Sequence, residues 1–281
     1  MAGFSSSYKL FFLLLNLCYV HLLLSLSCAS SAKSASMTLA SVRNSLIKQE
    51  DTIIFCLIQR ARFPINSHSY TSSSFLNGSS ILTYYVKHIE VIQSEVGGYA
   101  NPEEVPFFNY HLSSPVVPPN EPEKFLYPAA ASVNISEIIL KTYIEKLVPL
   151  FTSSGDDGQY ALSVASDMAC LQALSRRIHY GRFVAETKFR GAKADYISAI
   201  NSQDKATLTK LITNKSVENT VKARVYKKAK IFGQNVSLHD NKSNTTTKYK
   251  VDPLVVSHIY GEWIIPLTKL VELEYLLRRL N

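Results

Sequence analysis

One stretch without proline, residues 170–190, most constrains how this chain can fold. Its sequence is CLQALSRRIHYGRFVAETKFR, and its apolar residues recur at the three- and four-residue spacing of an amphipathic helix. We therefore predict one long helix here. At 3.6 residues per turn, Arg177 and Lys188 lie about three turns apart and differ in direction by about 20°. The two cations are thus predicted to point to the same side of the helix.

Small or apolar residues lie between these two cations on the same stripe, namely Gly181, Val184 and Ala185. A glycine inside a helix costs about 1 kcal/mol relative to alanine, and close approach of a backbone or a ligand is one reason to keep it. Two inward cations over a glycine indicate a buried anion. The alternative is that both cations are solvated, and spacing alone does not separate the two interpretations. We expect the remaining arginines of the stretch to be solvated: Arg176, Arg182 and Arg190.

The net charge of the chain favours an anionic partner. Its 281 residues carry a formal charge of +8, and the sequence pI is near 9.2. Lysine and arginine are spread through the helical segments, and no basic run with interleaved aromatic residues stands out, so we expect no nucleic-acid partner. No phosphate-binding loop, dinucleotide fingerprint or metal-ligand spacing occurs, and we expect no cofactor and no metal.

The first 29 residues have the layout of a secretory signal peptide. Lys9 precedes an apolar run over residues 10–26, and small residues follow at a suitable cleavage point. A signal anchor is the alternative, because a run of about 17 residues is near the lower limit for spanning a bilayer. We predict a protein of the secretory pathway without stable membrane association after cleavage. A linker over residues 30–36 and a folded domain over residues 37–281 follow.

Two features fit secretion less well. Cys56 and Cys170 each lie in an apolar helical pattern, and one possible pair is no disulfide framework, so we interpret both as small core residues. Met37 offers an internal start for a cytosolic form. A plastid transit peptide is less consistent with the leader, because such peptides are amphipathic and lack a continuous apolar run. Sequons for glycosylation are consistent with secretion but individually weak: Asn77, Asn134, Asn214, Asn235, Asn241 and Asn244.

Helical periodicity recurs along the rest of the chain, and no long alternating pattern or tandem repeat is present. A proline-rich excursion over residues 101–128 and a polar loop over residues 233–250 interrupt it. Pro266 is expected to bend the last helix. We predict an all-α fold, a single domain of many helices, with further helical segments at 37–62, 80–96, 134–151, 195–201, 204–212, 216–232 and 254–280.

Two further pairs of polar residues share a helical face at a spacing of four. They are Asn214 with Glu218, and Thr268 with Glu272. Glu272 has apolar neighbours, a setting that favours the protonated form of a carboxyl group, which can donate a hydrogen bond. Arg43 lies at the margin of the first helix's apolar face, where a side chain reaching outward is the alternative to a ligand contact.

No Ser/His/Asp or Cys/His grouping can be defended in this sequence, and His179 is interpreted as a core or surface histidine. The polar pairs instead suit a pocket that holds a dicarboxylate and stabilises negative charge that develops during a unimolecular change. Such catalysis needs positioning and electrostatics but no covalent step.

From residue 37 to the C-terminus, the sequence resembles the all-helical chorismate mutases of plants and fungi, which convert chorismate to prephenate in the shikimate pathway. The strongest stretches are SVRNSLIKQEDTIIFCLIQRARF, NPEEVPFF, YPAAASVN, SGDDGQYALSVASDMACLQALSRRIHYGRFVAETKF and IPLTKLVELEYLLRRLN. The resemblance implies an isomerase of phenylalanine and tyrosine biosynthesis that acts as a homodimer. The alternative is a secreted helical binding protein that kept this fold and lost the activity.

The resemblance also implies a role for each polar position found above. Arg43 and Arg177 would grip the substrate, and Lys188 and Glu272 would flank the ether oxygen whose bond breaks. The remaining substrate-binding positions are Asn214, Glu218 and Thr268.

Regulated members bind an aromatic amino acid between subunits through a Gly-Ser pair and arginines. Leu162-Ser163 and Gly97-Gly98 stand at those positions here, which implies an isoform that aromatic amino acids do not regulate.

Overall fold

Helices account for the regular structure of residues 37–118, 125–234 and 249–280, the part of the chain that this computed structural model describes. Within these ranges no strand occurs beyond an isolated bridge between Gln234 and Tyr249. The all-α prediction is confirmed. Contacts within the chain group Thr38–Asn281 into one compact unit. The predicted leader and linker, residues 1–29 and 30–36, lie outside the described residues.

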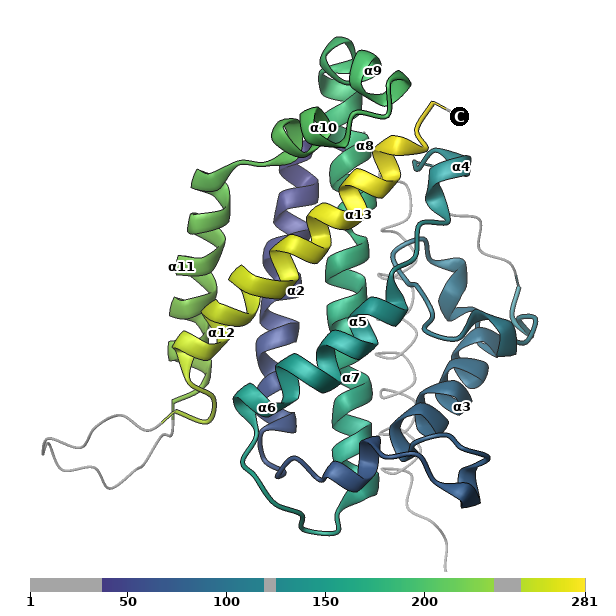
Figure 1. The fold of residues 1–281 in the computed structure, drawn as a ribbon, viewed down its shortest axis with the longest axis vertical. Helices are drawn as coiled ribbons and strands as arrows, with labels where there is room; N and C mark the ends of the chain where they lie inside the picture. Colours follow the sequence, from purple (N-terminus) through teal and green to yellow (C-terminus); the bar gives the residue numbers. More distant parts are fainter. Residues whose placement is uncertain (1–36, 119–124, 235–248, 281) are drawn as a thin grey trace, which may run out of the picture. The chain divides into compact units, whose positions relative to one another are not determined.

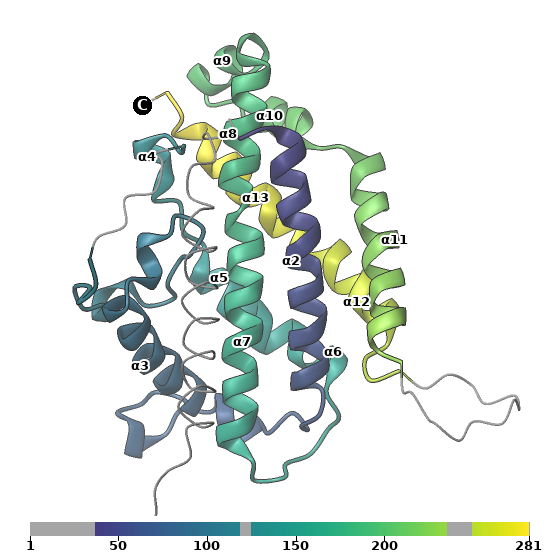
Figure 2. The same cartoon turned by 180° about the vertical axis from the view of Figure 1, so that it is seen from behind.

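Two antiparallel helices, α2 (Leu39–Arg60) and α7 (Tyr160–His179), lie side by side at the centre (Figures 1 and 2). Thr38 begins α2 with a reciprocal cap, because its side chain accepts the N–H of Ser41 while the Ser41 side chain accepts the N–H of Thr38. The apolar residues of α2 then pack into the core against α7.

The predicted long helix over residues 170–190 is two helices. Tyr180 separates α7 from α8 (Gly181–Gly191), and α13 (Ile265–Leu277) crosses them (Figure 1). A Cβ atom at Gly181 would lie 2.7 Å from the carbonyl oxygen of Thr268. The glycine is therefore needed because the backbone of α13 approaches α8 closely at this point.

Shorter helices complete the unit, with α11 beside α2 and α3 beside α7 (Figure 2). Most lie within a few residues of their predicted bounds. They are α3 (Ile81–Glu95), α4 (Pro128–Ala131), α5 (Ser136–Thr142), α6 (Val148–Phe151), α9 (Lys193–Asn201), α10 (Lys205–Ile212), α11 (Lys215–Phe232) and α12 (Pro253–Ile259). Short 3₁₀ turns lie at Ser67–Tyr70, Ser74–Leu76, Gly98–Ala100 and Asn109–His111.

Each of two prolines in helical segments follows a local change in winding. A π-helical turn, Tyr260–Ile264, joins α12 to α13 just before Pro266, and a second, Tyr143–Leu147, joins α5 to α6 before Pro149. Because proline lacks an N–H and its ring clashes with the preceding turn, wider winding upstream of each proline keeps the helix continuous.

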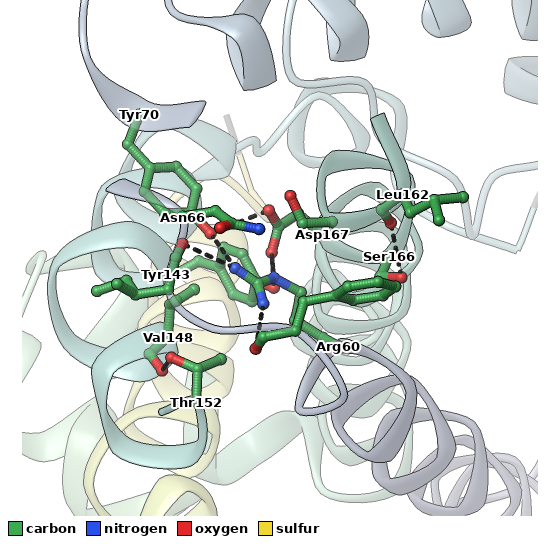
Figure 3. A network of polar contacts seen from close by, with 12 residues as sticks. Arg60, Asn66, Tyr70, Tyr143, Val148, Thr152, Leu162, Ser166 and Asp167 are labelled. Atoms are coloured by element: carbon green, nitrogen blue, oxygen red, sulfur yellow. Dashed lines mark hydrogen bonds and ion pairs between the residues drawn. The ribbon is translucent and has the colours of Figure 1, made fainter. Parts of the chain in front are cut away.

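A buried ion pair fastens α2 to α7 near one end of the core (Figure 3). Arg60 Nε donates to Asp167 Oδ1 at 2.5 Å, and the hydroxyls of Tyr143 and Tyr70 donate to the same carboxylate at 2.7 and 3.0 Å. The other guanidinium nitrogens of Arg60 donate to the Tyr70 hydroxyl and to backbone carbonyls of residues 63–65. Every donor of this buried cation is thus satisfied.

One expectation for the central stretch is wrong. Arg182 is buried, and its guanidinium donates to the carbonyl oxygens of Ala131, Pro102 and His179. Burial lowers the pKa of Arg182 to about 10. Helical spacing could not predict this, because two of the three carbonyls, those of Ala131 and Pro102, come from segments distant in the sequence. Within the described ranges, no helix has the length and apolarity needed to cross a bilayer.

Candidate active site

A pocket of about 340 Å³ lies between helices that are far apart in the sequence. Its polar side chains come from five helices, α2, α7, α8, α11 with its N-cap, and α13. Much of the remaining wall is apolar: Leu39, Leu46, Ile47, Val184, Val221 and Ile265. Residues predicted as site residues from the sequence line it: Arg43, Arg177, Lys188, Asn214, Glu218, Thr268 and Glu272.

Arg177 is a buried cation with few protein partners. Only 4% of its surface is exposed, and its Nη1 donates to Thr268 Oγ1 at 3.2 Å. Its Nε is buried without a hydrogen-bond partner among the described residues. Burial lowers the pKa of this guanidinium, against the pull of nearby Tyr260 and Glu50. Because a buried charged donor without an acceptor costs free energy, this arrangement is suited to receive an anion.

Lys188 and Glu272 form an ion pair from opposite helices of the pocket. Lys188 Nζ donates to Glu272 Oε2 at 2.8 Å and to the carbonyl oxygen of Ile212 at 2.9 Å. Ile212 is the last residue of α10, where unpaired carbonyls favour a cation. Burial raises the pKa of Glu272, and Lys188 opposes this only in part. A buried carboxyl group with a raised pKa can hold a proton and donate it in a hydrogen bond.

Asn214 and Glu218 lie at the first turn of α11, and both already have partners. Asn214 is the N-cap, and its Oδ1 accepts the N–H of Val217 at 3.1 Å, so its amide nitrogen is the group left for a ligand. Glu218 accepts from Lys269 Nζ at 2.9 Å and from Lys215 Nζ at 3.4 Å. Although partial burial acts to raise it, the pKa of Glu218 is lowered by these two lysines.

The last two predicted residues differ in exposure. Arg43 is exposed and reaches the pocket from the first turns of α2. Thr268 is buried, accepts the hydrogen bond of Arg177, and donates its own hydroxyl proton to the carbonyl oxygen of Ile264 at 2.6 Å. Thr268 therefore holds Arg177 in place from the neighbouring helix.

Three charged lining residues were missed from the sequence: Glu50, Arg224 and Lys269. Glu50 is fully buried and accepts two hydrogen bonds from Arg224, at 2.8 and 2.6 Å. The sequence could have predicted Glu50, because Glu50 follows Arg43 by seven residues, which places it two turns along the same face of α2. No comparable signal marked Arg224, whose partner is far away in the sequence.

The chemistry open to this pocket is set by its cations and its apolar wall. Arg43, Arg177 and Lys188 are close enough to line one small space, and neither cysteine nor histidine is among its lining residues. The arrangement suits a small dianion and the stabilisation of negative charge on an oxygen beside Lys188.

Comparisons with known proteins agree with this chemistry. A family model described as chorismate mutase type II matches residues 163–273. Chorismate mutase 2 of Arabidopsis thaliana is 52% identical over 257 residues, which cover 90% of this chain and 97% of the relative. The cytosolic chorismate mutase 2 of Zea mays is 45% identical over 251 residues, covering 89% of this chain and 99% of the relative.

The fold has a solved counterpart as well. The crystal structure of AtCM1 with phenylalanine bound in its allosteric site matches with a TM-score of 0.79 and 43% sequence identity. The match covers 89% of this chain and 99% of that one.

The prediction of a secreted protein is wrong. The Zea mays relative is named as cytosolic, and a chloroplastic chorismate mutase 1 of Arabidopsis thaliana is 43% identical. The prediction rested on the apolar run over residues 10–26, which lies outside the described residues. Hydropathy measures the preference of a segment for apolar surroundings, and this preference alone does not identify the compartment that receives the chain.

Sequence identity of 52% over nearly the whole length of this chain and of its Arabidopsis thaliana relative is enough to assign the family. The chain belongs to the all-helical chorismate mutase family, type II, and is an isomerase of that family.

Proposed function

We propose that the pocket lined by Arg177, Lys188 and Glu272 is the active site, in which chorismate rearranges to prephenate. One observation carries the proposal: the Lys188 to Glu272 pair lies in the same pocket as a buried Arg177 whose Nε lacks a partner among the described residues. The pocket therefore combines unused positive charge for the substrate's carboxylates with two potential donors to a single oxygen.

Binding of the substrate is the task of the two arginines. Chorismate carries two carboxylates, and the bond-forming carbon atoms meet only when the enolpyruvyl side chain folds over the ring. Arg177 binds one carboxylate through its unused donors, and the exposed Arg43 closes on the other from α2. Holding the dianion in this folded shape lowers the barrier, because the rearrangement then starts from a near-attack geometry.

Lys188 and Glu272 act on the ether oxygen. In the rearrangement the ether C–O bond breaks as a new C–C bond forms, and negative charge builds on the oxygen. Lys188 has three N–H donors, of which Glu272 and Ile212 occupy two, so one is left for this oxygen. Glu272 donates its proton to the same oxygen when it is in its neutral form. Each donor is expected to contribute about 3 kcal/mol to the transition state.

The remaining residues fix the orientation of the substrate. The amide nitrogen of Asn214 donates to a carboxylate, and Glu218, held by Lys269, accepts from the ring hydroxyl. Thr268 contributes by holding Arg177. These contacts position the substrate without entering the bond changes.

Substitution of Lys188 tests the assignment. Lys188→Ala is expected to lower kcat for chorismate at least about a hundredfold while the helical circular dichroism stays unchanged. The matched control is Lys210→Ala, which removes an exposed lysine near the end of α10 that does not line the pocket. Equal turnover in the Lys188→Ala variant and the wild type would remove Lys188 from the mechanism.

We further propose that aromatic amino acids do not regulate this enzyme. Leu162 projects into solvent with 56% of its surface exposed, where the regulated pattern has a glycine, and Ser163 is turned inward to the carbonyl of Tyr160. Gly97 has a φ of +79°, and a Cβ atom there would lie 2.9 Å from the Val117 side chain. An arginine at this position would therefore be strained. AtCM1 by contrast binds phenylalanine in an allosteric site.

Titration of the activity with tryptophan, tyrosine and phenylalanine is the test. The rate at subsaturating chorismate is expected to stay constant for each of them. A change of several-fold with any one effector would refute the proposal without touching the assignment of the active site.

A homodimer is the proposed assembly. The N–H of Val116 donates to the carbonyl oxygen of Glu95 at the end of α3, so Val116 lies near Val96, the next residue after Glu95. Both valine side chains are exposed. Val116 alone has 80% of its surface exposed. Light scattering during gel filtration should give twice the chain mass, and Val116→Asp should shift it towards one chain mass.

The proposed compartment is the cytosol, with residues 37–281 as the catalytic domain. The support is the name of the Zea mays relative and the grouping of Thr38–Asn281 into one unit. A chain that starts at Met37 is expected to match the full chain in kcat and KM. Loss of activity in that shorter chain would show that the first 36 residues contribute to the fold.

A further inference from the structure

Cys56 on α2 and Cys170 on α7 are the free cysteines of the described residues, and the proposed mechanism uses neither. The sequence predicted them to be small core residues without a partner framework. Cys170 is indeed buried, with 1% of its surface exposed, whereas Cys56 is only partly buried. The two thiols therefore differ in access to solvent.

The register of the two helices places these cysteines opposite each other. Arg60 near the end of α2 pairs with Asp167 in the first half of α7 (Figure 3), and the two helices are antiparallel (Figure 1). Cys56 precedes Arg60 by four residues, and Cys170 follows Asp167 by three, so each cysteine lies one turn along from its half of the ion pair. Cys56 packs against the buried cluster that contains Cys170, and each thiol affects the pKa of the other.

The contact makes the two thiols chemically unequal. Burial raises the pKa of the Cys170 thiol, which therefore keeps its proton. The neighbouring Cys170 thiol, together with the Arg176 cation, lowers the pKa of Cys56, although partial burial acts against it. A more acidic, accessible thiol next to a protonated second thiol is the arrangement in which oxidation is both selective and reversible.

We propose that Cys56 is a hydroperoxide-reactive thiol of this protein and that Cys170 is its resolving partner. The Cys56 thiolate attacks the distal oxygen of hydrogen peroxide, the O–O bond breaks, and a sulfenic acid and hydroxide result. The Cys170 sulfur then attacks the sulfenic sulfur and loses its proton, and the oxygen leaves as water. Two thiols are oxidised to one disulfide while the peroxide is reduced, and a dithiol reductant reverses the change.

The disulfide would join the two helices that carry Arg43 and Arg177. Cys56 lies 13 residues from Arg43, which corresponds to about 20 Å along α2, so the new bond forms away from the pocket. Thiol chemistry is therefore readable independently of the mutase activity. A variant without catalytic function should oxidise like the wild type.

Peptide mapping of the full chain after exposure to hydrogen peroxide tests the proposal. Trypsin releases Cys56 in peptide 49–60 and Cys170 in peptide 147–176, whereas Cys18 and Cys28 share peptide 10–33. We expect loss of both free thiols from the first two peptides and their appearance as one cross-linked species, which dithiothreitol reverses. Recovery of both as free thiols, or as separate sulfinic acids, would overturn the proposal.

Two variants assign the roles of the two thiols. In Cys170→Ala, dimedone should trap a sulfenic acid on Cys56 that accumulates because nothing resolves it. In Cys56→Ser, Cys170 should keep its free thiol under the same exposure. Oxidation of Cys170 ahead of Cys56 would reverse the assignment and overturn it. Far-UV circular dichroism confirms that each variant is folded, and the wild-type map decides the question if a variant is not.

Discussion

Two arginines of the central helix pair are almost equally buried and do opposite things. Arg60 has no exposed surface and directs every guanidinium donor to an acceptor, with Asp167 as its counter-ion. Arg177 has 4% of its surface exposed, and its Nε finds no partner in the described part of the chain. Arg60 is satisfied within the fold, whereas Arg177 keeps a buried donor without a partner among the described residues, which we propose binds the substrate.

The difference lies in where the compensating charge comes from. Burying a cation costs several kcal/mol, and a protein either supplies the anion itself or leaves the place to a substrate. At Arg60 the anion is a carboxylate on the neighbouring helix. At Arg177 the wall is mostly apolar and the nearest carboxylates, Glu50 and Glu272, are taken by Arg224 and Lys188. Burial alone does not mark a functional charge, but burial without satisfaction does.

The largest effect is expected from removing Arg60. Arg60→Ala should lower the free energy of unfolding by about 4 kcal/mol, because Asp167 is left buried without its counter-ion. Urea denaturation followed by circular dichroism measures this. The control is Arg60→Met combined with Asp167→Leu, which removes both charges and should recover a large part of the loss. A single variant as stable as the wild type would contradict the structural role of Arg60.

Removing Arg177 should give the reverse pattern. Arg177→Ala is expected to weaken transition-state stabilisation by about 3 kcal/mol, which lowers kcat/KM more than about a hundredfold. The free energy of unfolding should change by less than about 1 kcal/mol. Arg176→Ala is the matched control, because Arg176 is adjacent to Arg177 on α7 but pairs with Glu104 and does not line the pocket. If Arg177→Ala unfolds the protein as Arg60→Ala does, the distinction between the two arginines fails.

The smallest effect is expected on the pH dependence of kcat and concerns Glu272, the buried carboxyl group near Arg177. Glu272 has a pKa raised by burial, so its neutral form is lost only as the pH rises through that raised value. The activity of the wild type should therefore fall towards alkaline pH, and Glu272→Gln, which donates at every pH, should flatten this limb of the kcat profile. Profiles of kcat measured from acid to alkaline pH decide the matter. An unchanged alkaline limb in Glu272→Gln would exclude Glu272 as the titrating donor.

Much of the candidate site could be predicted because helical spacing is local. The prediction that two residues share a face depends only on the 3.6 residues per turn of a helix. It applied to Arg177 and Lys188, three turns apart, and to two pairs one turn apart, Asn214 with Glu218 and Thr268 with Glu272. The resemblance to a known family named the same positions, including Arg43 at the margin of the first helix's apolar face. Their gathering in one pocket agrees with both arguments.

Other features lay beyond any local pattern. Arg182 was expected in solvent, but its guanidinium donates to the carbonyl oxygens of Ala131, at the end of α4, and of Pro102. The predicted long helix is divided at Tyr180, and α13 approaches the backbone closely at the next residue, Gly181. Glu50 meets Arg224, which lies 174 residues away in the sequence. These contacts depend on which helices pack together, which periodicity within one helix does not specify.

The sequence by itself determined the helices, the faces on which cations and carboxylates lie, and the family. Only the tertiary structure decided which of those charges are satisfied. Arg60 and Arg177 occupy similar apolar helical patterns, and nothing local distinguishes them. Satisfaction of a buried charge depends on acceptors that other segments bring within about 3 Å, and that distance exists only after the helices have packed.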